Sequence, residues 1–179
     1  VESMLELIRD LIRPSVILSD NVSVKVAPLS QMMKAHPGPV IGTHPLFGPE
    51  PAEGEDRVAV TPGRDDADNT ALTAVRQWLE RLGFETFETT AEEHDEAVAH
   101  IQGLNFVTTV AYLATLSQEE KYSRFLTPSF HRRLESAKKM LTQDAELFAT
   151  LFETNPFGQD AVRRYRNFLH VAAGGDMDI

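Results

Sequence analysis

Polar side chains that could do chemistry follow two short apolar runs near the start of the chain. Residues 20–25 read DNVSVK and residues 43–50 read THPLFGPE. Ligands of open α/β sheets bind beyond the carboxyl ends of the strands, so these two segments are the first candidates for a site. The imidazole of His44 can take up or release a proton near neutral pH, and Ser23 offers a hydroxyl. Taken alone, a histidine beside a proline is more often a turn residue, and such a serine more often caps a turn.

The composition excludes several other kinds of function. A net charge of -10, with a pI near 5.0 and no dense run of Lys or Arg, would repel phosphates, so we expect no nucleic-acid partner. The chain has no cysteine, which rules out a disulfide framework and a cysteine nucleophile. No pair of histidines or carboxylates has convincing metal-ligand spacing, and no apolar stretch approaches the ~20 residues of a membrane span. We therefore expect no metal, no membrane partner and a cytoplasmic protein.

The first half of the sequence is predicted to be an α/β structure. Apolar periodicity predicts helices over 1–13 and 68–82 and strands over 15–20, 39–42, 57–61 and 84–89. Gly83 stands where a left-handed residue would end the second of these helices. The order of these elements is helix, strand, strand, strand, helix and strand, which favours a largely parallel open sheet.

The second half is predicted to be entirely helical. Helices are expected over 91–116, over about 128–152 and from 156 onwards. Thr90 and Glu93 form a capping box at the start of the first, and Asn155 precedes Pro156 as an N-cap at the start of the third. His94 lies in the first turn of the first helix, where we expect it to form a local hydrogen bond or to pack, without a chemical role.

Two motifs resemble those of a known family. The turn D-x-x-S-V-K at 20–25, followed about twenty residues later by G-x-H-P-x-F-G-P at 42–49, is similar to the paired active-site loops of prephenate dehydrogenases. The resemblance covers nearly the whole chain, through EHD at 93–95, IQGL at 101–104, AY at 111–112, TP at 127–128, QD at 143–144 and Asn155. It implies an oxidoreductase of tyrosine biosynthesis that uses NAD or NADP, takes a prephenate-like small molecule and forms a homodimer.

The resemblance also implies roles for individual residues. His44 matches the catalytic histidine, which accepts a hydrogen bond from the substrate 4-hydroxyl while hydride leaves C4 and the ring carboxylate departs as CO₂. Ser23 matches the serine that orients this histidine, the substrate and the nicotinamide, and Ser23 and Pro45 are the expected cofactor-binding residues. Glu50 falls where some relatives place an acid near the substrate. Lys25 is expected to be structural or electrostatic.

Substrate-binding positions in the helical half depart from the family pattern. Phe106, with Asn105 beside it, stands where many relatives have a substrate-binding histidine. His131 stands where the family commonly has an arginine that grips a substrate carboxylate, and Arg132 or Arg133 could supply that charge. Arogenate and 4-amino-4-deoxyprephenate therefore stay open as substrates beside prephenate itself.

The sequence contains no G-x-G-x-x-G turn of the kind that cradles a dinucleotide pyrophosphate. We therefore expect residues 1–89 to be the C-terminal part of a Rossmann-like nucleotide-binding domain that lacks its N-terminal dinucleotide-binding segment. Residues 90–179 are expected to be an all-α domain for substrate binding and dimerisation. A dimeric module that binds a prephenate-like ligand without catalysis is the alternative, and the choice between NAD and NADP stays open.

Overall fold

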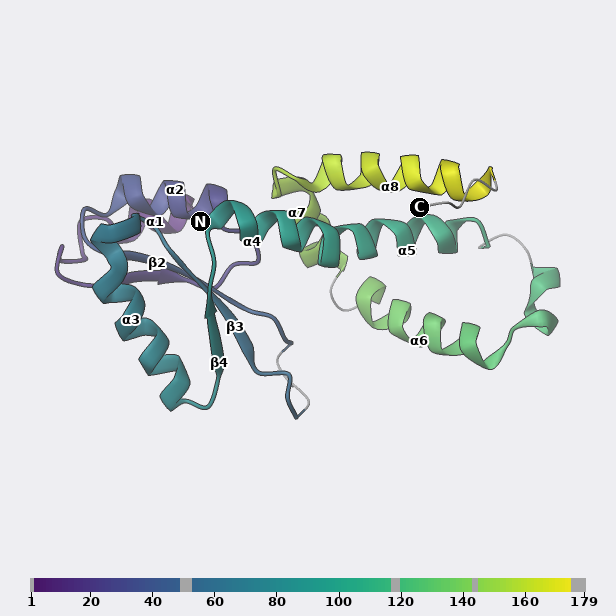
Figure 1. Cartoon of the computed structure of the whole chain (residues 1–179), viewed down its shortest axis with the longest axis horizontal. Coiled ribbons are helices and arrows are strands. Elements are labelled where there is room, and N and C mark those ends of the chain that lie inside the picture. The colour runs from purple at the N-terminus through teal and green to yellow at the C-terminus, as the bar shows by residue number, and fades with distance from the viewer. Residues whose placement is uncertain (1, 49–52, 117–119, 143–144, 175–179) are drawn as a thin grey trace. The chain divides into compact units, whose positions relative to one another are not determined.

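The computed structural model describes residues 2–48, 53–116, 120–142 and 145–174. The chain divides into two compact units, Val1–Asp95 and Glu96–Ile179. The first unit is a sheet with helices, and the described part of the second is helical, so the predicted α/β fold followed by an all-α segment is confirmed (Figure 1). Within the described ranges, no helix combines the length and the apolar character that a membrane span needs.

The first unit contains most of the predicted elements and one helix that was not predicted. They are α1 (Glu2–Ile8), β1 (Leu18–Asp20), α2 (Val26–Ala35), β2 (Val40–Pro45), β3 (Arg57–Pro62), α3 (Asp65–Arg81) and β4 (Glu85–Glu88). α4 (Ala91–Val98) begins in this unit and ends in the second. The helix predicted over 1–13 is shorter than expected, because its regular part stops at Ile8.

The strands form one sheet in the order β1-β2-β3-β4. β1 pairs with β2 and β3 pairs with β4 in parallel, as predicted, whereas β2 and β3 are antiparallel. The antiparallel pair follows from its short connection. A parallel neighbour needs a crossover of a dozen or more residues, usually with a helix, and the segment 46–56 is shorter than that.

Both faces of this sheet are covered by helices. Ile41, Val58 and Val60 pack with residues of α3, including Leu72, whereas Val40 packs with Leu29 and Met32 of α2 and with Leu5 of α1. Val40 and Ile41 are neighbours in β2 and therefore point to opposite faces of the sheet. α3 thus covers one face, and α1 and α2 cover the other (Figure 1).

α2 is the helix that the sequence pattern missed. The side chain of its N-cap residue, Lys25, makes no capping hydrogen bond. Instead, the carboxylate of Asp95 accepts the backbone N–H of Lys25 at 2.7 Å and that of Val26 at 2.9 Å. Because this cap comes from a residue far along the chain, no signal near the start of the helix in the sequence predicts it. Pro28 is tolerated because the first-turn N–H groups need no intrahelical partner.

The described part of the second unit consists of helical segments joined end to end. They are η1 (Ala99–Gly103), a π-helical turn, α5 (Leu104–Ala114), the 3₁₀ segment η2 (Glu120–Phe125), α6 (Pro128–Thr142), α7 (Ala145–Thr154) and α8 (Gly158–Ala173). The π-turn interrupts the helix predicted over 91–116. The helix predicted over 128–152 appears as α6 and α7, and residues 143 and 144 lie outside the described part.

Local capping signals were good predictors where the partner lies nearby. Glu93 donates its backbone N–H to Oγ1 of Thr90 at 3.1 Å, which confirms the Thr90 half of the capping box, whereas the Glu93 carboxylate accepts from Oγ1 of Thr89. Gly83 has a φ of 97°, the left-handed conformation expected after α3. The predicted start at Pro156 was wrong by two residues, because Oδ1 of Asn155 accepts the N–H of Phe157 in a turn and α8 begins only at Gly158.

Gly42 in β2 is the glycine whose replacement should be most informative. A Cβ at this position would lie 2.8 Å from Cδ of Lys25 and 3.3 Å from Cδ2 of Leu29, both on α2 or at its cap. We expect Gly42→Ala to lower the free energy of unfolding by about 1–3 kcal/mol, as overpacking does in cores. Urea denaturation would measure this loss.

Gly48→Ala is the matched control for this substitution, because a Cβ there meets nothing within 4 Å. Its effect should stay within about 0.5 kcal/mol. Equal stability of the two variants would contradict the close packing of Lys25 against β2.

Candidate active site

The two predicted segments meet at one edge of the sheet. β1 and β2 are adjacent and parallel, with Asp20 paired to Gly42, so their carboxyl ends lie side by side. Oδ1 of Asp20 accepts the backbone N–H of Thr43 at 3.2 Å, and Oγ1 of Thr43 donates to the Asp20 carbonyl. The end of β1 is therefore tied to the residue directly before His44.

Lys25 forms a buried ion pair that closes the first of these segments on itself. Its side chain is fully buried, and Nζ lies 2.8 Å from Oδ1 of Asp20 and 2.6 Å from the carbonyl oxygen of Val22. Burial raises the pKa of Asp20 and lowers that of Lys25, while the attraction between the two charges opposes both shifts. Lys25 thus acts as an internal cation that holds the loop 20–25 in one conformation.

Ser23 lies in the loop that Lys25 closes. Its side chain is half-buried, and none of the described residues forms a hydrogen bond with its hydroxyl. Oδ2 of Asp20 is buried and likewise has no partner in the described part of the chain. The hydroxyl of Ser23 is therefore the accessible polar group of this loop that a ligand could satisfy.

His44 is buried and neutral. Only 5% of the residue is exposed, and its Nδ1 lies 2.9 Å from Nε2 of His94, with the two rings edge to face. The pKa of His44 is lowered to about 3, chiefly by burial and to a smaller extent by positive charge on His94 and Lys25, while Asp95 opposes the shift. At neutral pH the imidazole therefore carries no charge and has a lone pair with which to accept a proton.

His94 and Asp95 are the residues of this site that sequence reasoning missed. His94 does form the expected local hydrogen bond, with its Nδ1 2.8 Å from Oδ1 of Asp95, but its other nitrogen reaches His44. The two histidines lie fifty residues apart in the sequence. The motif EHD was the one available signal, because no spacing rule links a first-turn histidine to a strand end.

Two further residues were predicted at this edge of the sheet, and the structure describes one of them. Pro45 is half-buried at the end of β2 and pairs with Val58 of β3. Glu50 lies outside the described residues. The structure therefore brings His44, Pro45 and the loop of Ser23 to one edge of the sheet.

The predicted substrate residues of the helical half lie in the second unit. Phe106 stacks on Phe148, with ring centroids 5.6 Å apart. The guanidinium of Arg133 lies over the ring of Tyr112, 3.8 Å from its centroid, so it joins α6 to α5. The other three residues, Asn105, His131 and Arg132, are exposed.

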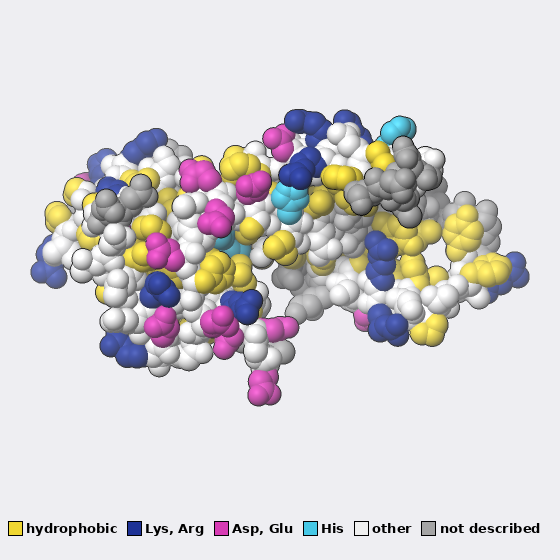
Figure 2. All heavy atoms as spheres, in the orientation of Figure 1, with side chains coloured by type: hydrophobic (Ala, Val, Ile, Leu, Met, Phe, Trp, Pro, Cys, Tyr) yellow, Lys and Arg dark blue, Asp and Glu magenta, His cyan; other side chains and the backbone are white. Residues whose placement is uncertain are grey.

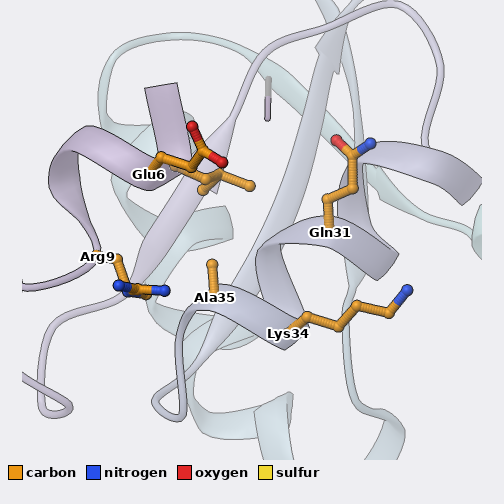
Figure 3. Close-up of a pocket in the computed structure, with 6 residues that line it drawn as sticks. Glu6, Arg9, Gln31, Lys34 and Ala35 are labelled. Carbon is orange, nitrogen blue, oxygen red and sulfur yellow. The ribbon is translucent and has the colours of Figure 1, made fainter. Parts of the chain in front are cut away.

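A groove between α1 and α2 is a weaker candidate for a binding site. It has a volume of about 350 Å³ and is lined on one side by Glu6 and Arg9 and on the other by Gln31 and Lys34 (Figure 3). These polar side chains are at the surface, and none is a buried group without a partner. Among the described residues, no group of three or more His, Asp or Glu side chains could hold a metal ion.

The sequence is similar to proteins of one family. A family profile described as "Prephenate dehydrogenase, nucleotide-binding domain" matches residues 1–87. The T-protein of Enterobacter agglomerans is 32% identical over 155 residues, which cover 83% of this chain and 40% of that protein. A probable arogenate/prephenate dehydrogenase of Methanocaldococcus jannaschii is 29% identical, over 81% of this chain and 34% of its own length. The chain thus spans about two fifths or less of these relatives.

Solved structures show the same fold. The prephenate dehydrogenase of A. aeolicus, in complex with hydroxyphenyl propionate and NAD+, matches 99% of this chain and 66% of that chain with a TM-score of 0.80 and 17% identity. The Synechocystis arogenate dehydrogenase matches 98% of this chain and 68% of that chain with a TM-score of 0.66 and 21% identity.

The burial of neutral His44 predicts a dependence of stability on pH. The unfolded chain takes up a proton at His44 below about pH 6.5, whereas the folded chain does so only near pH 3. Stability is therefore complete above the unfolded pKa and falls as the pH drops towards the folded pKa. This one residue should contribute up to ~1.4 kcal/mol per pH unit to the slope.

Urea denaturation at a series of pH values would measure this contribution as the difference in slope between the native chain and His44→Asn. The offset between the two at pH 8 records the loss of packing and of the hydrogen bond to His94. Identical slopes for both proteins would mean that the folded state does not keep His44 neutral.

Proposed function

Because the chain belongs to the prephenate dehydrogenase family, we propose that it carries the reaction pocket of an NAD(P)-dependent oxidative decarboxylation of prephenate to 4-hydroxyphenylpyruvate. The observation that carries this proposal is the buried, neutral imidazole of His44 at the carboxyl edge of β1 and β2. A neutral imidazole can accept the hydroxyl proton that such a reaction releases, whereas an imidazolium cannot.

His44 would act as the general base. The C4–H bond of the cyclohexadienol breaks with its electron pair leaving as hydride, and the 4-hydroxyl proton passes to the imidazole as the C4–O bond becomes a carbonyl. The bond to the ring carboxylate then breaks, CO₂ leaves, and its electron pair makes the ring aromatic as the carbonyl oxygen becomes a phenolate, which takes the proton back from the imidazolium. The low pKa of His44 means that the proton is held only transiently and is passed on.

The loop of Ser23 fits the nicotinamide end of the cofactor. Its half-buried hydroxyl and the buried Oδ2 of Asp20 are polar groups that the described residues leave without partners. Ser23 and Pro45 would hold the nicotinamide, which when bound supplies the hydride acceptor. Positioning by a loop that Lys25 keeps rigid would favour the geometry needed for transfer. The 179 residues contain no G-x-G-x-x-G turn, so they fit this end of the cofactor and not its pyrophosphate.

Substrate binding is assigned to the residues that depart from the family pattern. Arg132, Arg133 and His131 would bind substrate carboxylate, and Arg133 already stacks on Tyr112, which limits its motion. Phe106 and Asn105 would contact the substrate where many relatives have a histidine. Glu50 is the last of the proposed substrate-binding residues. Prephenate and arogenate differ in their side chain and not at the ring centre that His44 serves, so these residues would decide between them.

Turnover tests this function directly. In the natural protein that carries this chain, His44→Asn should lower kcat by about 10²–10⁴, the usual contribution of a general base. Ser23→Ala should lower it less, because its role is to position. NADH or NADPH formation would be followed by absorbance with prephenate and arogenate in parallel.

Lys34→Gln is the control for this experiment, since Lys34 lies on α2 away from the loop ends. It should keep the native rate. Undiminished turnover in His44→Asn would exclude the proposed base, and no turnover with either substrate would exclude the proposed reaction.

The second unit would mediate a homodimer. Large apolar side chains are exposed on several of its helices, and yellow side chains are visible over its surface in Figure 2. They include Ile101, Phe125, Leu147, Tyr165, Phe168 and Leu169. Exposed apolar area of this extent is typical of a surface that another chain covers. The visible face of the first unit shows acidic and basic side chains together with apolar ones (Figure 2).

The oligomeric state checks this assignment. We expect sedimentation equilibrium to give the mass of a dimer, and Phe168→Glu in α8 to weaken association at least tenfold by placing a charge in an apolar interface. Leu7→Glu is the control, because Leu7 is also exposed but lies in α1. A monomer at all concentrations, or equal weakening by both substitutions, would argue against a dimer formed by the second unit.

A further inference from the structure

Three buried side chains form one continuous row of hydrogen bonds from a helix end to the proposed base. Asp95 contacts His94 at 2.8 Å, and His94 contacts His44 at 2.9 Å. Asp95 is fully buried, and His94 and His44 are 4% and 5% exposed. At its other end the row is fixed to α2, since Asp95 also contacts the backbone nitrogens of Lys25 and Val26.

The backbone of α2 sets the direction of these hydrogen bonds. A backbone N–H can only donate, so Oδ1 of Asp95 accepts from Lys25 and Oδ2 accepts from Val26. Oδ1 also faces Nδ1 of His94, which must then be the nitrogen that carries hydrogen. In neutral imidazole the other nitrogen, Nε2, has only a lone pair.

The hydrogen bond between His94 and His44 determines in the same way which nitrogen of His44 carries hydrogen. When His94 is neutral its Nε2 can only accept, so Nδ1 of His44 must donate to it. This leaves Nε2 of neutral His44 without hydrogen, and the described residues give that atom no hydrogen-bond partner. A neutral imidazole without such a neighbour could carry its hydrogen on either nitrogen.

We propose that His94 and Asp95 are positioning residues, which fix His44 in the tautomer with hydrogen on Nδ1 and thereby make Nε2 the atom that accepts the substrate's hydroxyl proton. The use of that proton rests on the proposed function, whereas the tautomer does not. Loss of the acceptor on His94 would allow His44 to carry hydrogen on Nε2, where it would donate and not accept.

Nitrogen NMR can observe the tautomer in the chain itself. With ¹⁵N-labelled histidine at pH 8, long-range ¹H–¹⁵N spectra distinguish a ring nitrogen that carries hydrogen from one that does not. We expect Nδ1 of His44 to carry hydrogen and Nε2 to be bare, and the same for His94. His94→Phe keeps an aromatic ring but removes the acceptor, and should move hydrogen to Nε2 in a substantial fraction of His44.

A second variant and a control separate positioning from packing. Asp95→Ala leaves no acceptor for the hydrogen on Nδ1 of His94, so the hydrogen of His94, and with it that of His44, should become divided between the two ring nitrogens. His36→Phe is the control, because His36 is also a buried histidine of the first unit, but it contacts the carbonyl oxygen of Val16 and lies outside the row. It should cost stability and leave the His44 spectrum unchanged. If His94→Phe does not fold, the proposal is tested by the native spectrum alone, which shows whether Nδ1 or Nε2 of His44 carries hydrogen.

Hydrogen on Nε2 of His44 in the native chain, or an unchanged tautomer in folded His94→Phe, would overturn this proposal. In the natural protein His94→Phe should lower kcat at least about tenfold and leave KM within about twofold, because a wrong tautomer impairs proton transfer more than binding. The two proposals fail separately. A native Nδ1–H tautomer without any turnover contradicts the proposed function, whereas turnover with the opposite tautomer contradicts the positioning role.

Discussion

The carboxylate of Asp95 joins α2 and α4 through three short hydrogen bonds. It accepts two backbone N–H groups at the start of α2 and faces one imidazole nitrogen of α4. A negative charge at a helix N-terminus is stabilised both by the unpaired amides and by the helix dipole. α2 in turn covers one face of the sheet, and His94 reaches β2 at His44. The position of the helix and the state of the imidazole therefore depend on one buried anion.

A second buried charge organises the loop beside it. Lys25 begins α2 with its backbone and pairs with Asp20 through its side chain, so one residue links the helix cap to the end of β1. Gly42 leaves the space in β2 that this side chain occupies. Breaking a buried pair leaves an uncompensated charge, which is far more costly than losing a surface pair. The loop with Ser23 is therefore held by interactions that resist rearrangement, as a positioning role requires.

The sequence predicted those features whose causes are local. Apolar runs marked the strands, Thr90 capped α4, and Gly83 ended α3 because each signal lies within a few residues of its effect. α2 was missed because its cap comes from Asp95, and the antiparallel pairing of β2 with β3 was missed because the mixture of helices and strands favoured parallel strands. In the site, His44 and Ser23 were found through a motif. The contact of His94 with His44 could not be found, because it exists only once the sheet and α4 have come together.

Hydrogen exchange at the start of α2 tests this account most directly. The backbone amides of Lys25 and Val26 would normally exchange fast, since the first amides of a helix have no intrahelical acceptor. If Asp95 caps them, both should exchange only through global unfolding of the first unit, and Asp95→Ala should release these two amides while those of β2 and β3 stay protected. Fast exchange of both amides in the native chain would show that Asp95 does not hold α2, and the account of the site built on it would be wrong.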